Sequence, residues 1–326
     1  MVITRTPLRI SIGGGGTDLP SYYQQFGGCV ISAAISQYIF VSVNRMFSEG
    51  YLLKYSALEN AKTVDEISHP LLREVLRRHN DGGRIEIASL ADVPAGTGLG
   101  SSGTFTVGLL KALYAFKRQS ATAQQLAEEA CDIEINVLKR AIGKQDQYIA
   151  SFGGLTCFDF RPDGTVEAKP LAISDETLLD LEHNLLMFFT GYSRSSIGVL
   201  SDQHERSVKG DTTMIENLHF TKQLGQLAKA TLESGNTRQY AELMKEHWEH
   251  KRVRSQGMSN SQINHWHETG MNNGALGGKL VGAGGGGYLL FYAEDPMRVR
   301  RAMTAEGLIE LRFRFDHDGS TVLVRD

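Results

Sequence analysis

A glycine-rich stretch near the middle of the chain constrains its fold more than any other feature. The segment PAGTGLGSSGTFTVGLLKAL, residues 94–113, follows the strand-like run RIEIASL at residues 84–90. Apolar residues then recur at helical spacing, at Phe105, Leu109, Leu113 and Phe116. The pattern predicts a strand, a tight glycine loop and a helix in direct succession.

The loop has the composition of an anion-binding site. Gly96, Gly98 and Gly100 let the backbone turn its N–H groups inward, because no side chain obstructs them. Ser101 and Ser102 stand at the expected helix start, where unpaired N–H donors and the helix dipole attract an anion. A di- or triphosphate suits such a loop, and a tight turn with serine caps is the alternative. No Lys-Ser or Lys-Thr pair follows the last glycine, so this is not a Walker A loop.

Two further glycine clusters are less specific. GAGGGG at residues 282–287 has the glycine count of a dinucleotide fingerprint, but the run YLLFY after it is strand-like, whereas that fingerprint must open a helix. We therefore expect its backbone to pack closely against another loop, which argues against a dehydrogenase. GGGGTD at residues 13–18 follows an expected strand, and Asp18 is either a binding group or an ordinary turn residue.

An acidic residue on an apolar helix stripe is a candidate metal ligand. Thr122 and Gln125 form a capping-box pattern that opens a predicted long helix through about Arg140. Glu134 lies on the apolar side of this helix, and its neighbours three and four positions away are Ala130, Cys131, Val137 and Leu138. A buried carboxylate needs a partner, because an unpaired buried charge is costly. That partner is either an arginine or a metal ion, and a nearby phosphate loop favours the metal.

A basic and an acidic residue follow shortly after that helix. In GKQDQYIASFGG, Lys144 and Asp146 stand at the start of the next helix or loop. Asp146 is either an N-cap or a general base kept ionised by a neighbouring cation. An anion loop, a buried carboxylate and an Asp–Lys pair together predict a phosphoryl-transfer site, where positioning, Mg²⁺ and a hydroxyl acceptor are required.

Composition narrows the class of protein. A chain of 326 residues with 41% hydrophobic and 22% charged residues can form two domains. From about residue 174 onward the pattern changes to one strand followed by several helical stretches, so we expect an α+β molecule with domains at residues 1–174 and 175–326. The formal net charge of −3 argues against a nucleic-acid partner. No signal peptide or run of roughly 20 apolar residues is found, so we expect no membrane partner and a cytoplasmic location. Three cysteines without C-x-x-C spacing argue against a disulfide framework and a zinc site: Cys29, Cys131 and Cys157.

Three motifs, in order along nearly the whole chain, resemble those of the GHMP kinases, the superfamily of galactokinase, homoserine kinase, mevalonate kinase and phosphomevalonate kinase. They are TPLRISIGGGGTDLP, PAGTGLGSSGTFT and KLVGAGGGGYLLF. The first of them, with GKQDQY and TGYSRSS, is most similar to the bacterial D-glycero-D-manno-heptose 7-phosphate kinases, which phosphorylate the anomeric hydroxyl. Galactokinases carry Glu-His before the Thr-Asp pair, and Gly15 and Gly16 at those positions argue against galactose.

The resemblance implies a two-domain GHMP kinase fold, with a ribosomal-protein-like α/β N-terminal domain, a ferredoxin-like C-terminal domain and an ATP site between them. It implies that the nucleotide phosphates are bound by Pro94, Gly96, Thr97, Gly98, Leu99, Gly100, Ser101, Ser102 and Gly103. Gly103 stands where many GHMP kinases have alanine, a departure that puts little in doubt. Ser102 and Glu134 would hold Mg²⁺, and residues 282–286 would pack against the phosphate loop.

The resemblance also implies which residues act on the sugar phosphate. Asp146 would accept the hydroxyl proton, and Arg9 or Lys144 would stabilise charge. The residues implied to contact the substrate are Arg9, Gly15, Gly16, Thr17, Asp18, Asp146 and Arg194.

Arg194 is a candidate for gripping the distal phosphate of that sugar. TGYSRSS places it after a strand end, with Ser195 and Ser196 at an expected helix start, and arginine can hold phosphate bidentately. A surface arginine followed by serine caps is the alternative. Arg140 and Lys144 are candidate helpers.

Other functions remain compatible with the same motifs. One is a GHMP kinase of an unphosphorylated sugar, similar to fucokinase or galactokinase, and another is a non-catalytic sugar sensor on the same fold. The sequence leaves the oligomeric state open. Four histidines are interpreted as ordinary surface or core residues because no metal motif accompanies them: His247, His250, His265 and His267.

Overall fold

One long strand organises the first sheet. The computed structural model describes residues 1–79, 82–192 and 197–326. β2 (Gly28–Arg45) pairs with β1 (Val2–Gly13) along most of its length. Its first part pairs on the other side with β6 (Leu155–Phe160) and its last part with β5 (Ile85–Ala91). β1 and β2 therefore hold the whole sheet together.

Four shorter strands complete this sheet. Its order is β12-β1-β2-β5-β3-β4, with β6 beside β2 and β7 beside β6. β3 runs parallel to β5, whereas the other pairs are antiparallel. The bounds of these strands are Tyr51–Lys54 for β3, Leu58–Ala61 for β4, Val166–Pro170 for β7 and Thr321–Arg325 for β12.

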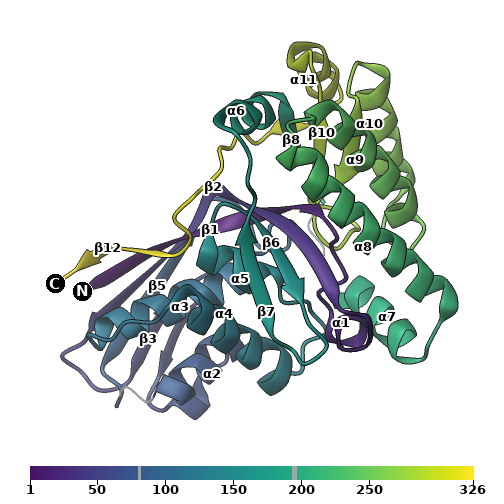
Figure 1. Cartoon of the computed structure of the whole chain (residues 1–326). Coiled ribbons are helices and arrows are strands. Elements are labelled where there is room, and N and C mark those ends of the chain that lie inside the picture. Colours follow the sequence, from purple (N-terminus) through teal and green to yellow (C-terminus); the bar gives the residue numbers. More distant parts are fainter. Residues whose placement is uncertain (80–81, 193–196) are drawn as a thin grey trace.

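Helices cover one face of the first sheet (Figure 1). α3 (Ser101–Phe116) packs on β1 and β2, and its apolar side, including Leu109 and Leu113, is fully buried. The capping box of Thr122 and Gln125 opens the next helix as predicted. The other helices here are α2 (Pro70–His79), α4 (Ala123–Cys131) and α5 (Gln145–Phe152), with a short 3-10 turn at Val64–Glu66. α1 (Pro20–Phe26) lies apart from them, beside α7 (Ile197–Val208) of the second domain (Figure 1).

The predicted long helix through about Arg140 is interrupted. α4 ends at Cys131, and a π-helical turn, Asp132–Val137, replaces the last part of it. Such turns widen a helix locally and are frequent at functional sites. Glu134 lies within this turn, so its side chain is placed by the irregularity rather than by regular helical spacing.

The second sheet confirms the expected ferredoxin-like domain. Its strand order is β11-β8-β10-β9 and all its pairs are antiparallel. Chain order β8, β9, β10, β11 in that spatial arrangement, with helices between β8 and β9 and between β10 and β11, is the split βαβ pattern. The bounds are Leu185–Phe189 for β8, Gly277–Leu280 for β9, Tyr288–Tyr292 for β10 and Ile309–Glu310 for β11.

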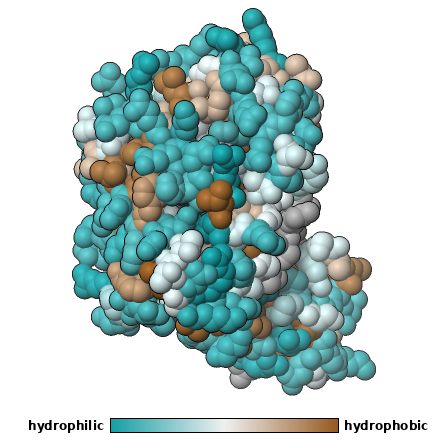
Figure 2. Space-filling view, turned by 90° about the vertical axis from the view of Figure 1, so that its right-hand side faces the viewer, coloured by the Kyte–Doolittle hydropathy of each residue, from teal (hydrophilic) through white to brown (hydrophobic). Residues whose placement is uncertain are grey.

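Helices form the outer layer of this second domain (Figure 1). The face that they present to solvent is mostly hydrophilic, with small separate hydrophobic spots (Figure 2), as expected for helices that bury one side. No helix among the described residues is both long and apolar enough to cross a bilayer. The helices are α6 (Asp175–Asn184), α7 (Ile197–Val208), α8 (Thr212–Glu233), α9 (Thr237–Arg252), α10 (Ser261–Asn272) and α11 (Pro296–Ala305).

The end of the chain corrects the predicted domain boundary. The sequence assigned residues 175–326 to the second domain, but β12 pairs with β1 and so belongs to the first sheet. The two termini lie side by side (Figure 1), and the amino group of Met1 is 3.2 Å from Asp326 Oδ2. The second domain is therefore an excursion of the chain out of the first sheet and back to it.

Candidate active site

A cavity of about 960 Å³ has walls from both domains. The first domain contributes β1, the glycine loop after β5 and the start of α5, and the second contributes α9, β9 and residues 281–286. This volume is at the upper end for small-molecule sites, so a nucleotide and a second substrate fit together.

The phosphate loop, residues 94–100, joins β5 to α3 as predicted. Gly96, Gly98 and Gly100 have φ angles of +78°, +81° and +82°, which glycine adopts without strain. The loop and the first turn of α3, residues 101–103, line the cavity, and the hydroxyl oxygen of Ser101 is buried there without a hydrogen-bond partner among the described residues. The side chains of Thr97 and Leu99 are fully buried and do not line the cavity, so these two residues can contribute only backbone.

The second glycine loop supports the first, as the resemblance implied. A Cβ atom at Gly282 would lie 2.6 Å from the Cα and carbonyl oxygen of Gly98. A Cβ atom at Gly287, one residue beyond the expected range, would lie 2.2 Å from the carbonyl oxygen of Thr97 in the first loop. β10 follows this loop directly, so the helix that a dinucleotide fingerprint requires is absent from residues 288–292.

Glu134 pairs with an arginine, one of the two kinds of partner that its position suggested. It is fully buried, and its Oε2 accepts hydrogen bonds from Ser102 Oγ at 2.6 Å and from Arg140 Nη1 at 3.0 Å. Gln147 Nε2 donates to its Oε1 at 2.9 Å, and Arg140 Nη1 also donates to Ser102 Oγ at 2.8 Å. The salt bridge between Arg140 and Glu134 is thus present. Arg140 contacts the oxygens of both Ser102 and Glu134, and such oxygen atoms are the ligands that Mg²⁺ prefers.

Asp146 is held by an arginine on β1. Arg9 Nε and Nη2 both lie 2.7 Å from Asp146 Oδ1, and Arg9 Nη1 donates to the carbonyl oxygen of Gly98 in the phosphate loop. Asp146 lies in the first turn of α5 and is not its N-cap, which is Lys144. Arg9 therefore fixes the carboxylate next to the phosphate loop.

Gly103 has a larger role than the sequence suggested. A Cβ atom at this position would lie 2.8 Å from Asp146 Cβ and 3.1 Å from the backbone nitrogen of Gln147. The missing methyl group lets α5 approach the start of α3 closely. The departure from alanine therefore bears on where Asp146 lies.

Lys144 does not join the site, which corrects its predicted role beside Asp146. Its ammonium donates to the carbonyl oxygen of Gly164 at 2.8 Å and lies 5.0 Å from the centre of the Tyr23 ring. The residue does not line the cavity. The charge beside Asp146 comes from Arg9 instead.

The turn of the first motif brings some of its predicted residues to the cavity. Gly15, Gly16 and Asp18 line it. Thr17 is fully buried, and its hydroxyl lies within hydrogen-bond distance of the carbonyl oxygens of Gly14 and Cys29, to which it can donate. Thr17 is therefore a structural residue, which corrects its predicted contact with substrate.

Asp18 links this turn to the helix of Asp146. Its Oδ1 accepts from the backbone N–H of Gly16 at 3.0 Å and its Oδ2 from that of Gln145 at 3.1 Å. Burial raises the pKa of Asp18, and these two hydrogen bonds act in the opposite direction. The carboxylate both lines the cavity and fixes the start of α5.

Basic residues of the second domain were missed by the sequence analysis. His247, Lys251, Arg254 and Lys279 all line the cavity and are nearly fully buried. Two of them, His247 and Lys251, lie on the buried side of α9 after Tyr240 and Met244, which is the same signal that identified Glu134. Of these four, only His247 is named in the sequence-based prediction, which interprets it as an ordinary surface or core residue. Arg194 lies outside the described residues.

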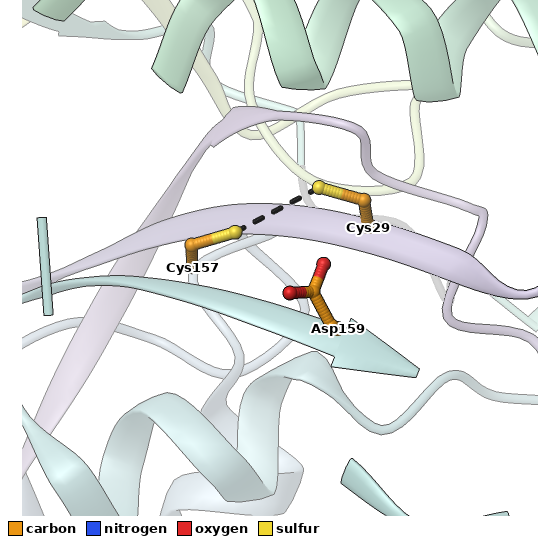
Figure 3. Close-up of side chains that lie close together, drawn as sticks. All are labelled: Cys29, Cys157 and Asp159. Atoms are coloured by element: carbon orange, nitrogen blue, oxygen red, sulfur yellow. Dashed lines mark hydrogen bonds between the residues drawn. The ribbon is translucent and has the colours of Figure 1, made fainter. Parts of the chain in front are cut away.

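The cysteines lie away from the cavity. Figure 3 shows Cys29 on β2 facing Cys157 and Asp159 on β6, and the two sulfur atoms are 3.7 Å apart. Their ligand atoms lie within 4.8 Å of one another, but the Asp159 carboxylate pairs with Lys169 at 3.5 Å and none of the three lines the cavity. The hydrogen bond with Cys157 and burial raise the pKa of the Cys29 thiol, so it stays protonated.

Comparison with known families gives two matches. The sequence profile of the GHMP kinases N-terminal domain matches residues 66–154, and that of the GHMP kinases C-terminal domain matches residues 227–308. The two profiles together span more than half of the chain, and the first contains the phosphate loop, Glu134 and Asp146.

Individual proteins are similar over nearly the whole chain. D-glycero-alpha-D-manno-heptose 7-phosphate kinase of Campylobacter jejuni is 28% identical over 319 residues, which cover 90% of each chain. The L-fucokinase/L-fucose-1-P guanylyltransferase of Bacteroides fragilis is 24% identical over 92% of this chain and 36% of its own length. The crystal structure of a D-glycero-D-manno-heptose 1-phosphate kinase from Bacteroides thetaiotaomicron is similar in fold, with a TM-score of 0.82, 24% identity and full coverage of both chains.

Proposed function

The chain is a member of the GHMP kinase family, and on this premise we propose that it transfers the γ-phosphoryl group of ATP to the anomeric hydroxyl of D-glycero-D-manno-heptose 7-phosphate. The products are the heptose 1,7-bisphosphate, ADP and the proton of the hydroxyl. The observation that carries the proposal is the contact of Arg9 with both Asp146 and Gly98. It places a carboxylate that can take a hydroxyl proton directly beside the loop that would hold the phosphates.

The loop and α3 would bind the phosphates of ATP. Backbone N–H groups of residues 96–103 and the positive end of the α3 dipole attract the negative charge. Ser102 and Glu134 are the residues that would hold Mg²⁺, because their oxygens lie 2.6 Å apart and Glu134 is fully buried. When bound, the metal ion supplies neutralisation of the charge on the phosphate oxygens.

Asp146 would orient the sugar hydroxyl and accept its proton. The carboxylate is a quarter exposed, with a 26% accessible side chain, so it can reach a substrate in the cavity while Arg9 holds its other side. Phosphoryl transfer requires little covalent help from the protein, and the positioning of the hydroxyl in line with the phosphate is the main task of such a residue.

The similarity to the heptose 7-phosphate kinase of Campylobacter jejuni supports a phosphorylated sugar as substrate. Similarity to fucokinases favours an unphosphorylated sugar as the second candidate. Gly15 and Gly16 at the positions of the galactokinase Glu-His pair disfavour galactose.

Consumption of ATP with a set of sugars tests the proposal. We expect turnover with heptose 7-phosphate, a much lower kcat/KM with free heptose, and a bisphosphate product that phosphorus NMR identifies as substituted at the anomeric position. Equal kcat/KM for the free and the phosphorylated heptose, or a preference for L-fucose, contradicts it. Sugar binding without any ATP consumption would indicate a sensor.

A further inference from the structure

The wall that the second domain contributes to the cavity is strongly basic. His247 and Lys251 lie on α9, Arg254 follows the end of that helix, and Lys279 lies on β9. Their exposed fractions are between 2% and 7%. We call these four residues the basic wall.

No acidic side chain among the described residues neutralises the basic wall. Lys279 Nζ donates to the carbonyl oxygen of Ile12, and Lys251 Nζ to those of Leu280 and Gly282. Arg254 donates to neutral oxygens, which belong to Asn217, Gly15 and Thr221. Every one of these acceptors is uncharged, so the basic groups are oriented but no negative charge stabilises their protonated forms.

The basic wall also has unused donors. An ammonium group has three N–H donors and a guanidinium five, and the bonds above use only one for Lys279 and three for Arg254. The Nε2 atom of His247 is buried without a hydrogen-bond partner among the described residues. Buried cations without a counter-charge are costly, and such a group is retained where a ligand supplies the missing negative charge.

The position of the basic wall relative to Asp18 and Asp146 indicates which anion it would bind. Arg254 Nη1 lies 3.2 Å from the carbonyl oxygen of Gly15, in the turn that Asp18 connects to the start of α5. Asp146 is the next residue after Gln145 in that helix. Arg254 therefore lies beside the turn at residues 13–18, which the resemblance implies to bind the sugar.

We propose that Arg254 and Lys279, with His247 and Lys251 beside them, bind the phosphate group that the sugar substrate carries away from its acceptor hydroxyl. This inference rests on the proposed function and adds to it the residues that would select a sugar phosphate over a free sugar. The guanidinium of Arg254 gives directional hydrogen bonds to phosphate oxygens, and Lys279 adds a point charge. Nothing in this assignment requires Arg194.

Steady-state kinetics with two sugars test the proposal. Arg254→Gln and Lys279→Met are compared with the unmodified enzyme on heptose 7-phosphate and on free heptose, at saturating ATP. We expect each variant to lower kcat/KM for the phosphorylated sugar roughly 10- to 100-fold, the range for losing a hydrogen bond to a charged group, and to lower it much less for the free sugar. Arg252→Gln is the matched control, because Arg252 lies two residues before Arg254 at the end of α9, pairs with Glu249 and does not line the cavity.

The outcomes separate this inference from the proposed function. Equal losses on the two sugars, or a higher KM for ATP with an unchanged sugar preference, overturn the role of the basic wall. If the unmodified enzyme does not prefer the phosphorylated sugar, the proposed substrate itself fails.

A binding measurement covers the case in which Arg254→Gln does not fold. Inorganic phosphate is added to the protein saturated with a non-hydrolysable ATP analogue, so that the phosphate loop is already filled. We expect phosphate to raise the midpoint of thermal unfolding of the unmodified protein and of Arg252→Gln. Lys279→Met should be as stable as the unmodified protein without phosphate and should lose most of the shift. An equal shift in Lys279→Met overturns the proposal.

Discussion

At the scale of single residues, Asp146 carries the chemistry that the site supports. Asp146→Asn keeps an oxygen that can accept from Arg9, so the local structure and the binding of ATP should change little. We expect turnover to fall by roughly 10² to 10⁴, the usual effect of losing a positioned base. Steady-state kcat and calorimetric binding of ATP measure the two effects separately. Near-normal turnover in the variant would show that Asp146 only orients the hydroxyl.

Glu134 and Arg140 can be separated by their response to magnesium. Glu134→Gln should raise the Mg²⁺ concentration needed for nucleotide binding by about tenfold or more, because a charged ligand of the metal is lost. Arg140→Gln should leave that requirement unchanged or lower it, because Arg140 competes for the same carboxylate oxygen. Magnesium titration of nucleotide binding measures both. The same increase in both variants would mean that Glu134 serves only the salt bridge.

Lys279 should make the binding of the sugar phosphate depend on pH. Burial lowers the pKa of Lys279 to about 7, and the other basic or titratable groups of the basic wall are His247, Lys251 and Arg254. A bound phosphate favours the protonated lysine, so affinity for the sugar phosphate should fall as pH rises from 7 to 9. Lys279→Met should abolish this part of the pH dependence, which calorimetry at several pH values measures.

The same lysine predicts the opposite trend for the stability of the ligand-free protein. In the unfolded chain its pKa returns to the ordinary value near 10.5, so between about pH 7 and 10 the unfolded state binds more protons than the folded state. The contribution of Lys279 to the free energy of unfolding therefore increases as pH rises through this window. Affinity and stability that changed in the same direction would speak against a phosphate at Lys279.

At the scale of elements, the contact between the two glycine loops sets the shape of the phosphate site. Gly282→Ala places a methyl group against Gly98 and should raise the KM for ATP about tenfold or more. Gly307→Ala is a matched control, since Gly307 has a φ angle of +81° and nothing within 4 Å of its Cβ position. Both variants carry a similar backbone strain, of the order of 1 kcal/mol, so only the loop contact distinguishes them. Equal effects on the KM for ATP would mean that strain alone is responsible.

Much of the site was predictable because its residues stand in local patterns. The phosphate loop lies between a strand and a helix, and Glu134 occupies an apolar stripe, so both could be identified from spacing. Lys251 occupies the same kind of stripe on α9 and could have been found by the same argument. The contacts that hold Glu134 in its π-helical turn could not, because Ser102 and Gln147 come from other elements.

Side-chain direction was the other limit of the sequence. Lys144 is two residues from Asp146, and the spacing alone placed both in one site. The structure turns Lys144 away because Tyr23 and the carbonyl oxygen of Gly164 offer it contacts on the other side of the helix start. Those partners are remote in sequence, so no local pattern reveals them.

At the scale of the whole molecule, the order of strands was the feature that the sequence left open. The alternating run that forms β12 is compatible with pairing in either sheet, and its partner β1 lies at the opposite end of the chain. Pairing over such a distance leaves no signal in spacing or composition. The prediction that residues 175–326 form the second domain therefore did not anticipate the return of β12 to the first sheet.

The return of β12 makes the first domain depend on the last residues of the chain. Thr321 and Val322 pair with Arg5 and Thr4 on β1, and Ser320 Oγ is 2.8 Å from the buried hydroxyl of Thr6. Removing residues 319–326 should therefore expose the edge of the strand that carries Arg9. We expect a lower midpoint of thermal unfolding, by several degrees or more, and weaker binding of ATP.

Deletion of Asp326 alone is the control for this truncation. It removes an exposed contact with the amino group of Met1 and one terminal backbone hydrogen bond to the carbonyl oxygen of Met1, so unfolding and ATP binding should stay close to those of the full chain. Thermal unfolding and calorimetric titration with ATP, measured on the two truncated chains side by side, separate the effect of the strand from that of the terminus. If the longer truncation left ATP binding intact, the first domain would fold without β12, and the boundary near residue 174 would mark an autonomous unit after all.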